Sequence, residues 1–250
     1  MTGIIIQART GSTRLPKKMI LPFFDGKGIL ETIINRIKKA NLEIPLVLAT
    51  TTNSSDDVLA EIALKLQIPV FRGSENNVLD RFIKAAEKYK FDKIIRICAD
   101  NPFLDLVALD KQIKAFNKMD VDYWCYSLSD NTPTIKTHYG FWTEGVKLTA
   151  LKKVAEYTDD RLYQEHVTNF IYSNPNQFSI HFEPIEKAIE QGENVRLTID
   201  TEEDFKLGQK IYSNLNEFEI PVTVKSILSY LKENPKYFET MKNEIVKNTK

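Results

Sequence analysis

A basic loop near the start of the chain is the part of the sequence best suited to chemistry. Residues 4–18 read IIIQARTGSTRLPKK, an apolar run followed by a loop with four cations: Arg9, Arg14, Lys17 and Lys18. Small residues in the loop let the backbone approach a ligand, and their N–H groups can form an anion-binding nest. Neither GxxxxGK[ST] nor GxGxxG is present, which excludes the Walker A and Rossmann motifs. The pattern predicts a polyphosphate site, with a solvated basic loop as the alternative.

Two aspartates follow apolar runs elsewhere in the chain. Asp100 comes directly after Ile94–Cys98, and Asp200 comes directly after Val195–Ile199. Ligands of open α/β sheets bind outside the carboxyl ends of the strands. Two carboxylates placed there can hold Mg²⁺, which keeps several waters and bridges to substrate phosphates. The pair therefore predicts a magnesium site.

Each aspartate also has a purely structural interpretation. Asp100 precedes Asn101-Pro102 and is a candidate turn residue. Asp200 is a candidate helix N-cap, with Glu203 three positions later completing a capping box. Both alternatives stay open at the level of the sequence.

The elements that would position these residues alternate between strands and helices. Apolar runs predict strands at residues 4–6, 46–50, 69–72, 94–98 and 123–127. Helical spacing predicts helices at residues 28–39, 54–66, 77–90 and 107–116. This order predicts an α/β protein with a three-layer α/β/α Rossmann-like architecture and a mostly parallel sheet.

The alternation stops after Ser127. The following residues predict loops or short strands, then two helices and a strand, at 128–145, 147–157, 160–173 and 178–182. We therefore interpret residues 128–194 as an α+β insertion that packs beside the main sheet, which resumes with Val195–Ile199. Three helices, near 202–214, 223–232 and 235–247, complete a single domain that spans residues 1–250.

Composition limits the function classes. The chain has 250 residues, with 34 Lys+Arg and 34 Asp+Glu, so the formal net charge is zero and no global field attracts nucleic acid or an anionic membrane. No signal peptide and no run of 18 apolar residues is present. We expect a cytoplasmic protein that binds neither nucleic acid nor membrane.

Five segments together carry a family resemblance. QARTGSTRLPKK, RGSENNVLDR, RICADNPFLD, EHVT and TIDTEEDF, in this order, resemble the spore-coat polysaccharide synthesis F family of cytidylyltransferases, and more distantly the CMP-sugar synthetases for 3-deoxy-manno-octulosonate and sialic acids. The resemblance covers most of residues 3–206. It implies a sugar-nucleotide transferase fold, CTP and Mg²⁺ as ligands, and transfer of CMP to a sugar or sugar acid with release of pyrophosphate. It also implies a homodimer.

The resemblance assigns roles to particular residues. A phosphate- and nucleotide-binding set is Ala8, Arg9, Gly11, Ser12, Arg14, Lys18, Ser74 and Arg81. Lys18, Arg14 and Asp100 match catalytic positions, and Asp100 and Asp200 match the metal carboxylates. The family pattern usually has Gly where Lys17 stands, so Lys17 could assist or replace Lys18. Arg81 has an alternative interpretation as a helix-surface residue.

The insertion is expected to bind the acceptor. Its candidate residues are Gly140, Glu144, Glu165 and His166. For His166 the alternative is an interior helix histidine with a backbone partner. Two other functions remain possible: a glycosyltransferase, for which Asp120-Val121-Asp122 is a poorly placed DxD candidate, and a non-catalytic nucleotide-binding protein.

Overall fold

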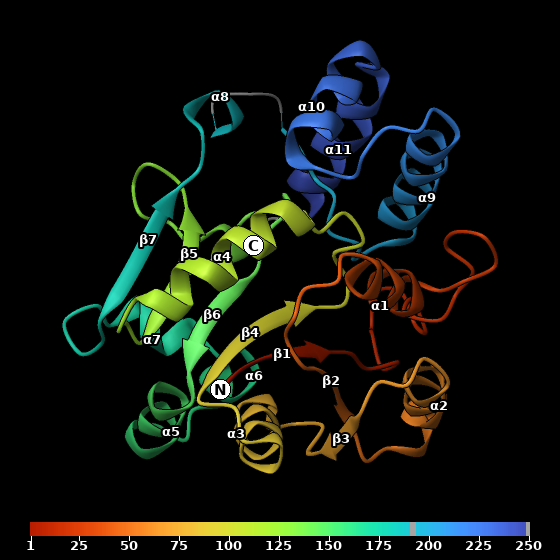
Figure 1. Ribbon diagram of the computed structural model, residues 1–250. Helices are drawn as coiled ribbons and strands as arrows, with labels where there is room; N and C mark the ends of the chain where they lie inside the picture. Colours follow the sequence, from red (N-terminus) through yellow and green to blue (C-terminus); the bar gives the residue numbers. More distant parts are fainter. Residues whose placement is uncertain (191–193, 249–250) are drawn as a thin grey trace.

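The apolar run near the N-terminus forms an interior strand, the third of seven, of a single sheet (Figure 1). The computed structural model describes residues 1–190 and 194–248 of the chain. In spatial order the strands are β3 (Val70–Gly73), β2 (Leu46–Thr51), β1 (Thr2–Gln7), β4 (Lys93–Cys98), β6 (Glu144–Lys147), β5 (Tyr123–Ser127) and β7 (Ile180–Pro184). Only β6 runs antiparallel to its neighbours β4 and β5, so the predicted mostly parallel sheet is confirmed.

Helices cover both faces of this sheet, which makes three layers. They are α1 (Ile29–Lys39), α2 (Asp57–Lys65), α3 (Val78–Tyr89), α4 (Leu106–Lys118), α5 (Leu148–Tyr157), α6 (Arg161–Glu165), α7 (Asn169–Ser173), α8 (Lys187–Glu190), α9 (Glu202–Glu217), α10 (Val224–Glu233) and α11 (Lys236–Lys247). Short 3₁₀ turns lie at Ser54–Asp56 and Thr134–Lys136. The described residues contain no helix with the length and apolar character needed to cross a bilayer.

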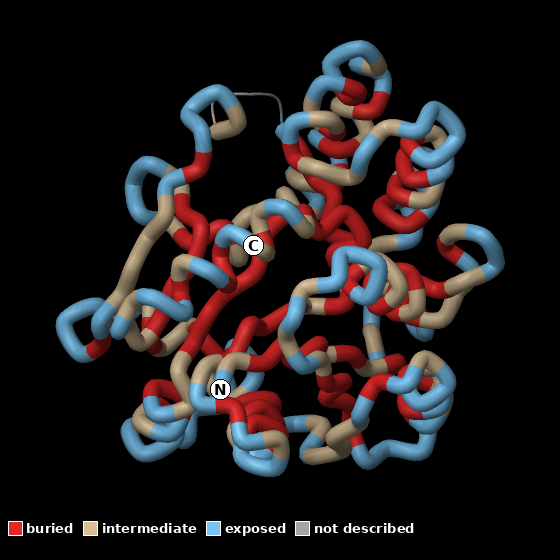
Figure 2. Tube along the Cα trace, viewed as in Figure 1, coloured by how far each residue is buried: buried red, intermediate tan, exposed pale blue. Residues whose placement is uncertain are grey.

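Alternation along the strands divides the core between the two faces. Ile4 and Ile6 of β1 pack with α1, α2, α4 and the C-terminal helices, whereas Ile5 packs with α3, α5 and α7. Successive strand side chains point to opposite faces, so a strand buried on both sides reads as a continuous apolar run. Figure 2 shows the result: the inner strands are buried, the edge strands β3 and β7 are partly exposed, and the outer faces of the helices are exposed.

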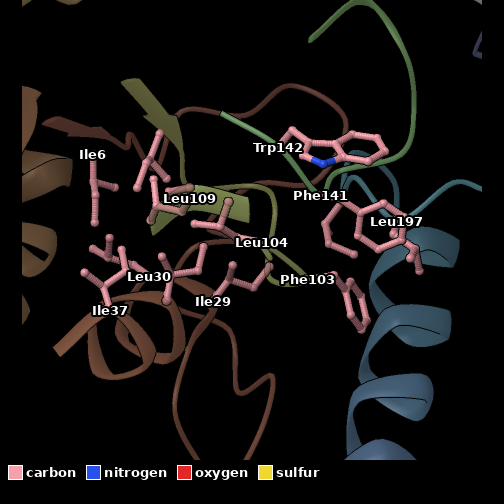
Figure 3. Packing of buried hydrophobic residues seen from close by; sticks show 14 of the residues in the cluster. Ile6, Ile29, Leu30, Ile37, Phe103, Leu104, Leu109, Phe141, Trp142 and Leu197 are labelled. Carbon is pink, nitrogen blue, oxygen red and sulfur yellow. The ribbon is translucent and has the colours of Figure 1, made fainter. Parts of the chain in front are cut away.

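The larger cluster also anchors the segments that carry the two aspartates. Phe103 and Leu104 follow Asp100, and Leu197 precedes Asp200; all three are at most 1% exposed. Figure 3 shows them packed in the same cluster as Ile29 and Leu30 of α1. Burial of these neighbours fixes the backbone on which each aspartate stands.

The predicted position of residues 128–194 relative to the sheet is wrong in one respect. These residues do not only pack beside the sheet, because they contribute β6, between β4 and β5, and the edge strand β7. The predicted helix at 160–173 is two short helices, α6 and α7. The end of this range includes residues 191–193, which lie outside the described residues.

The predicted return of the sheet at Val195–Ile199 is also wrong. No strand is present at these residues, although three of the five are apolar. Leu197 N–H donates to His138 O at 2.9 Å, and Ile199 N–H donates to Asp100 O at 2.9 Å. The backbone bonds of this segment therefore go to loops and not to a neighbouring strand.

Candidate active site

A cavity of about 580 Å³ lies at the carboxyl ends of β1 and β4. Its walls include the last residues of these strands, Gln7 and Cys98, together with both predicted metal carboxylates, Asp100 and Asp200. The opposite wall comes from the insertion, through residues that include Thr134, Gly140, Trp142, Glu165, His166 and Tyr172. One cavity thus joins the sheet end and the insertion.

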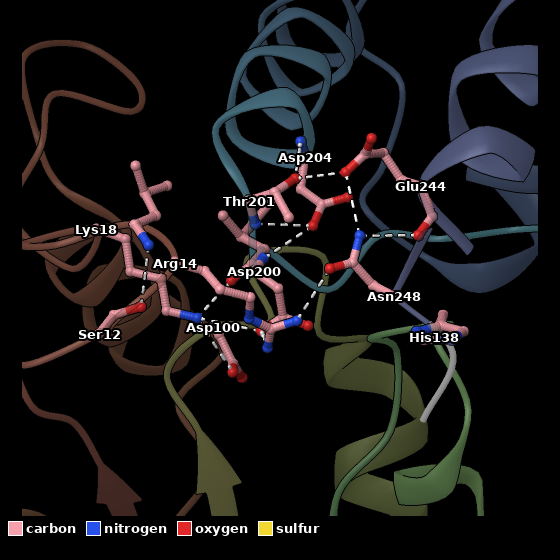
Figure 4. A network of polar contacts seen from close by, with 12 residues as sticks. Ser12, Arg14, Lys18, Asp100, His138, Asp200, Thr201, Asp204, Glu244 and Asn248 are labelled. Atoms are coloured by element: carbon pink, nitrogen blue, oxygen red, sulfur yellow. Dashed lines mark hydrogen bonds and ion pairs between the residues drawn. The ribbon is translucent and has the colours of Figure 1, made fainter. Parts of the chain in front are cut away.

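Lys18 lies between the two carboxylates. Its residue is 7% exposed, and its Nζ is 3.5 Å from Asp100 Oδ2 and 3.4 Å from Asp200 Oδ1 (Figure 4). The same ammonium donates to the backbone carbonyl of Ile199. The fold thus brings Lys18 next to two carboxylates, Asp100 and Asp200, that follow it by 82 and 182 residues in the sequence.

The neighbouring Lys17 is different. It is exposed, and its φ of +60° lies in the left-handed region that favours glycine. This backbone conformation is consistent with the glycine that the family pattern usually has at position 17. The geometry therefore brings Lys18 and not Lys17 to the carboxylates.

The other predicted loop residues surround this contact. Arg14 Nη2 is 3.1 Å from Asp200 Oδ1. Of the predicted loop residues that the structure describes, Arg14 lines the cavity. Ser12 Oγ accepts a bond from Leu15 N–H at 3.3 Å, so it shapes the loop. Ala8 is buried, with its N–H donating to Ala49 O at 3.4 Å, and Gly11 is exposed at the loop tip.

Asp56 anchors the start of the loop, a role that the sequence did not indicate. The backbone N–H and hydroxyl of Thr10 donate to Asp56 Oδ1 at 2.7 and 2.6 Å, and the hydroxyl of Thr51 donates to Oδ2 at 2.5 Å. Burial alone would raise the pKa of Asp56, but these hydrogen bonds outweigh it and lower the pKa. No indication of this role is visible in the sequence because Thr10 and Asp56 are 46 residues apart.

The structural alternative for Asp200 is wrong. The N-cap of α9 is Thr201, whose hydroxyl accepts from Asp204 N–H at 3.1 Å, while the Asp204 carboxylate accepts from Thr201 N–H at 3.0 Å. The capping box thus begins one residue later than the sequence interpretation placed it. Asp200 precedes the cap, and its carboxylate faces Lys18 and Arg14.

Asp100 combines both of its predicted roles. It lies in a turn in which Asn101 N–H donates to Cys98 O at 3.3 Å. Its carboxylate nevertheless lines the cavity and contacts Lys18. The turn interpretation and the site interpretation are therefore compatible.

Arg196 is a second residue that sequence reasoning missed. Its side chain is fully buried and binds Asp204 through Nε and Nη2, both at 2.7 Å. Nη2 also lies 3.5 Å from Asp200 Oδ2, and Nη1 lies 2.7 Å from His138 Nδ1. Burial alone would lower the pKa of Arg196, but hydrogen bonds from it to Asp204 raise the pKa. A permanent cation therefore stands behind Asp200.

The two aspartates are the residues that could hold a metal. Among the described residues no group of three or more His, Cys, Asp or Glu side chains forms a metal cluster. Two carboxylates fit Mg²⁺, since this ion commonly takes one or two carboxylates and completes its shell with phosphates and water. The ammonium of Lys18 within 3.5 Å of both shows that the pair accommodates a cationic centre.

Ser74 and Arg81 are not among the described residues that line the cavity. Arg81 is 1% exposed, so the alternative of a helix-surface residue is wrong. Its Nη1 donates to Ser74 O at 2.5 Å, and Ser74 Oγ accepts from Asn77 N–H at 3.0 Å. Burial first, and then repulsion from Arg9, lower the pKa of Arg81 to about 10.

Three of the four predicted acceptor residues line the cavity: Gly140, Glu165 and His166. His166 is exposed at the end of α6, so it is not an interior histidine. Arg9 Nη2 lies 3.5 Å from Glu165 Oε1, which links the basic loop to the insertion. At Gly140 the φ is +71°, and a Cβ there would lie 3.0 Å from the backbone of Leu197 and Thr198, so a side chain does not fit.

Glu144 is not among the described residues that line the cavity. It is 1% exposed within β6, where it pairs with Arg96 and accepts bonds from the hydroxyls of Tyr123 and Thr168. Burial first, and then the neighbouring Cys125 and the Glu144 carboxylate, raise the pKa of Tyr123, which keeps its phenol protonated as a donor. Arg96, which the sequence did not indicate, is the member of this pair that lines the cavity. Glu144 thus lies behind Arg96, where it balances the buried charge.

The DxD candidate of a glycosyltransferase is far from this site. Asp120 and Asp122 precede β5, at the amino end of a strand that runs in the same direction as β1 and β4. Asp120 is bound to Lys147, and Asp122 accepts from Ser179 N–H at 2.9 Å. These aspartates lie at the amino ends of the parallel strands, whereas Asp100 lies at the carboxyl ends.

Comparison with known proteins places the chain among nucleotidyltransferases. The model of the family described as "Cytidylyltransferase" matches residues 3–234. An uncharacterised protein of Methanocaldococcus jannaschii is 38% identical over 92% of this chain and 90% of its own. The spore coat polysaccharide biosynthesis protein SpsF of Bacillus subtilis is 34% identical over 92% of this chain and 94% of its own.

A solved structure agrees with these matches. A cytidylyltransferase from Leptospira borgpetersenii superposes with a TM-score of 0.83 at 30% sequence identity. The superposition covers 95% of this chain and 96% of that one.

Proposed function

This chain belongs to the cytidylyltransferase family, and from that premise we propose that it transfers CMP from CTP to a sugar or sugar-acid hydroxyl and releases pyrophosphate. The product would serve the synthesis of a surface polysaccharide or glycan, as the name of the Bacillus subtilis relative suggests for that protein. The observation that carries the proposal is the convergence of Lys18, Arg14, Asp100 and Asp200 at one end of a cavity whose other wall is the insertion.

The basic loop would hold the triphosphate. Lys18 and Arg14 supply two cations beside the carboxylates, and their charge would offset the charge that builds on the phosphates as pyrophosphate leaves. Catalysis of this kind consists mainly of positioning and electrostatic stabilisation. The anchor at Asp56 and the burial of Lys18 keep these groups in place before the substrate arrives.

Asp100 and Asp200 would hold Mg²⁺. When bound, this ion supplies Lewis-acid polarisation of the α-phosphate and lowers the pKa of a coordinated hydroxyl. In its absence Lys18 partly neutralises the pair, and Arg196 balances Asp200 from the protein side. Cations of the protein therefore face both carboxylates.

The acceptor would enter from the insertion. Glu165, His166 and the guanidinium of Arg96 line that part of the cavity, with Trp142 and Tyr172 as apolar walls. Convergent polar groups between aromatic surfaces suit a hydroxyl-rich ligand. None of the described side chains is placed as an obvious general base, so the chain's main contribution would be to orient the acceptor hydroxyl toward the α-phosphate.

Calorimetry with CTP tests the nucleotide half of this proposal. We expect CTP to bind in the presence of Mg²⁺ and to bind more weakly when EDTA removes the metal. Asp100→Asn and Asp200→Asn should reduce the metal-dependent part of the affinity, whereas Asp110→Asn, on the exposed face of α4, should not. Unchanged Mg²⁺–CTP binding in both site variants would contradict the metal assignment.

A further inference from the structure

We propose that the C-terminal helix α11 positions residues of the active site, with Asn248 and Glu244 as the positioning residues. Asn248 acts through Arg14, and Glu244 acts through Thr201, the residue that follows Asp200. The inference rests on the proposed function, because Arg14 and Asp200 belong to its nucleotide-binding end. It goes beyond the family assignment, since the family match ends at residue 234 and α11 begins at Lys236.

The helix is firmly held in the fold. Tyr237 and Met241 of α11 are 4% and 1% exposed and belong to the main core cluster. Asn214 of α9 donates to the hydroxyls of Tyr237 and Tyr230, at 3.2 and 2.8 Å. The end of α11 therefore reaches the site at a fixed place and is not a loosely attached tail.

Asn248 contacts Arg14 directly. Arg14 Nη1 donates to Asn248 Oδ1 at 3.4 Å, while Arg14 Nη2 binds Asp200 Oδ1 at 3.1 Å (Figure 4). Asn248 is itself fixed, because its Nδ2 donates to the backbone carbonyl of Glu244 at 3.0 Å. The arginine side chain is 50% exposed, and among the described residues these two contacts restrain its guanidinium.

Glu244 reaches the turn that carries Asp200. Its residue is 5% exposed, and Oε2 accepts from the Thr201 hydroxyl at 2.8 Å. That hydroxyl also accepts from Asp204 N–H as the N-cap of α9, so the bond that it donates to Glu244 orients its own O–H group. Thr201 is thus held by the start of α9 on one side and by α11 on the other.

The physical consequence is pre-organisation. An arginine has five N–H donors, and the contacts with Asn248 and Asp200 leave others free for phosphate oxygens. A guanidinium that is already oriented loses less rotamer freedom when it binds a phosphate, and it stabilises the transition state more effectively. Without Asn248, Arg14 would sample more directions at the mouth of the cavity.

The experiment compares Asn248→Leu with Asn243→Leu in the full-length protein. Asn243 is an exposed residue of the same helix, so the two variants change the same chemistry at different places. Pyrophosphate release should show kcat/KM for CTP about tenfold lower in Asn248→Leu than in Asn243→Leu, with the acceptor KM unchanged. Equal values in the two variants, or a change confined to the acceptor KM, would overturn the proposal.

Two further variants separate positioning from simple loss of structure. In an Arg14→Ala background the Asn248→Leu effect should disappear, because residues that act through one another are not additive. Glu244→Gln keeps an oxygen that can accept from Thr201 and should retain most of the activity that Glu244→Leu loses. Additive losses with Arg14→Ala, or equal losses in both Glu244 variants, would contradict the inference.

Hydrogen exchange tests the inference independently of activity. Backbone amides of residues 11–18 should exchange faster in Asn248→Leu than in Asn243→Leu. If the wild-type protein releases no pyrophosphate from CTP, the proposed function fails, and this measurement still decides whether α11 orders the loop. Identical exchange in the two variants would overturn the positioning role.

Discussion

The two ends of the cavity are built differently. At the end where we propose that the nucleotide binds (the nucleotide end), Lys18 is buried between Asp100 and Asp200, and Arg196 supports the second carboxylate from behind. At the end where we propose that the acceptor binds (the acceptor end), Glu165 and His166 are exposed, and the ion pair of Glu165 with Arg9 is a half-exposed contact at 3.5 Å. One end is a fixed electrostatic network, and the other is a wall with polar groups at its surface.

This difference indicates how the fold divides the work. Charge stabilisation requires groups that are in place before the reaction, so their cost in free energy is met during folding. Recognition of a hydroxyl-rich acceptor can use surface groups that exchange water for ligand. We therefore expect changes at the nucleotide end to affect turnover strongly, and changes at the acceptor end to affect acceptor affinity more gently.

The largest effect is expected at the carboxylates. Asp100→Asn and Asp200→Asn should each lower the Mg²⁺-dependent rate by roughly 1,000-fold, because a bound metal ion supplies several kcal/mol of transition-state stabilisation. Circular dichroism should show a native fold in both. A loss of only a few-fold would remove the main contrast between the two ends.

A buried pair beneath the acceptor end should respond through stability. Glu144→Gln leaves the guanidinium of Arg96 without its carboxylate partner in the interior of the sheet. We expect a loss of about 3 kcal/mol in the free energy of unfolding, the lower end of the range for breaking a buried pair. Urea denaturation measures this; a stable variant with a raised acceptor KM would instead show that Glu144 contacts the acceptor.

Within the basic loop, adjacent lysines should behave differently. Lys18→Ala should lower turnover by at least ~100-fold, the scale for losing one preorganised charge at a transition state. Lys17→Ala should stay close to wild type, because Lys17 is exposed and its neighbour contacts the carboxylates. The reverse order in steady-state kinetics would transfer the phosphate role to Lys17.

The sequence predicted those parts of the fold that have a local signal. β1, β4 and β5 are apolar runs and were predicted to within one or two residues. β6 has the sequence EGVK, which carries no clear strand pattern, and its pairing depends on β4 and β5 on either side. Val195–Ile199 has strand-like composition, but loops occupy the places of its neighbours.

The site follows the same rule. Motif positions such as Lys18 and Asp200 could be selected because their residue types carry chemistry. The supports could not, since Asp56, Arg96 and Arg196 acquire their roles from partners that only the fold brings near. Glu144 was assigned to the acceptor because its burial in β6 is not visible in the sequence.

A gentler effect is expected at the acceptor end. His166→Ala should raise the acceptor KM several-fold, with CTP affinity unchanged, because one surface contact to a substrate hydroxyl is lost. Gln164→Ala, on the same short helix but not on the cavity wall, is the matched control. A loss of CTP affinity with normal acceptor kinetics would abolish the proposed division.

The smallest effect is expected at Lys17. Lys17→Gly places a glycine at a backbone position whose φ is +60°, where a residue without a side chain is favoured. Turnover should stay unchanged, and the free energy of unfolding should change by less than about 1 kcal/mol. Thermal unfolding and pyrophosphate release measure the two quantities. A marked loss of turnover would show that the Lys17 ammonium takes part in the site.

Pyrophosphate release is the direct measurement of whether this cavity joins CTP to a sugar-like acceptor. Each of the four nucleoside triphosphates should be incubated with Mg²⁺ and a panel of sugars and sugar acids, with Asp200→Asn as the control. We expect release from CTP that requires both an acceptor and Asp200. Hydrolysis of intact nucleotide sugars, with no pyrophosphate from any triphosphate, would contradict it and favour a glycosyltransferase.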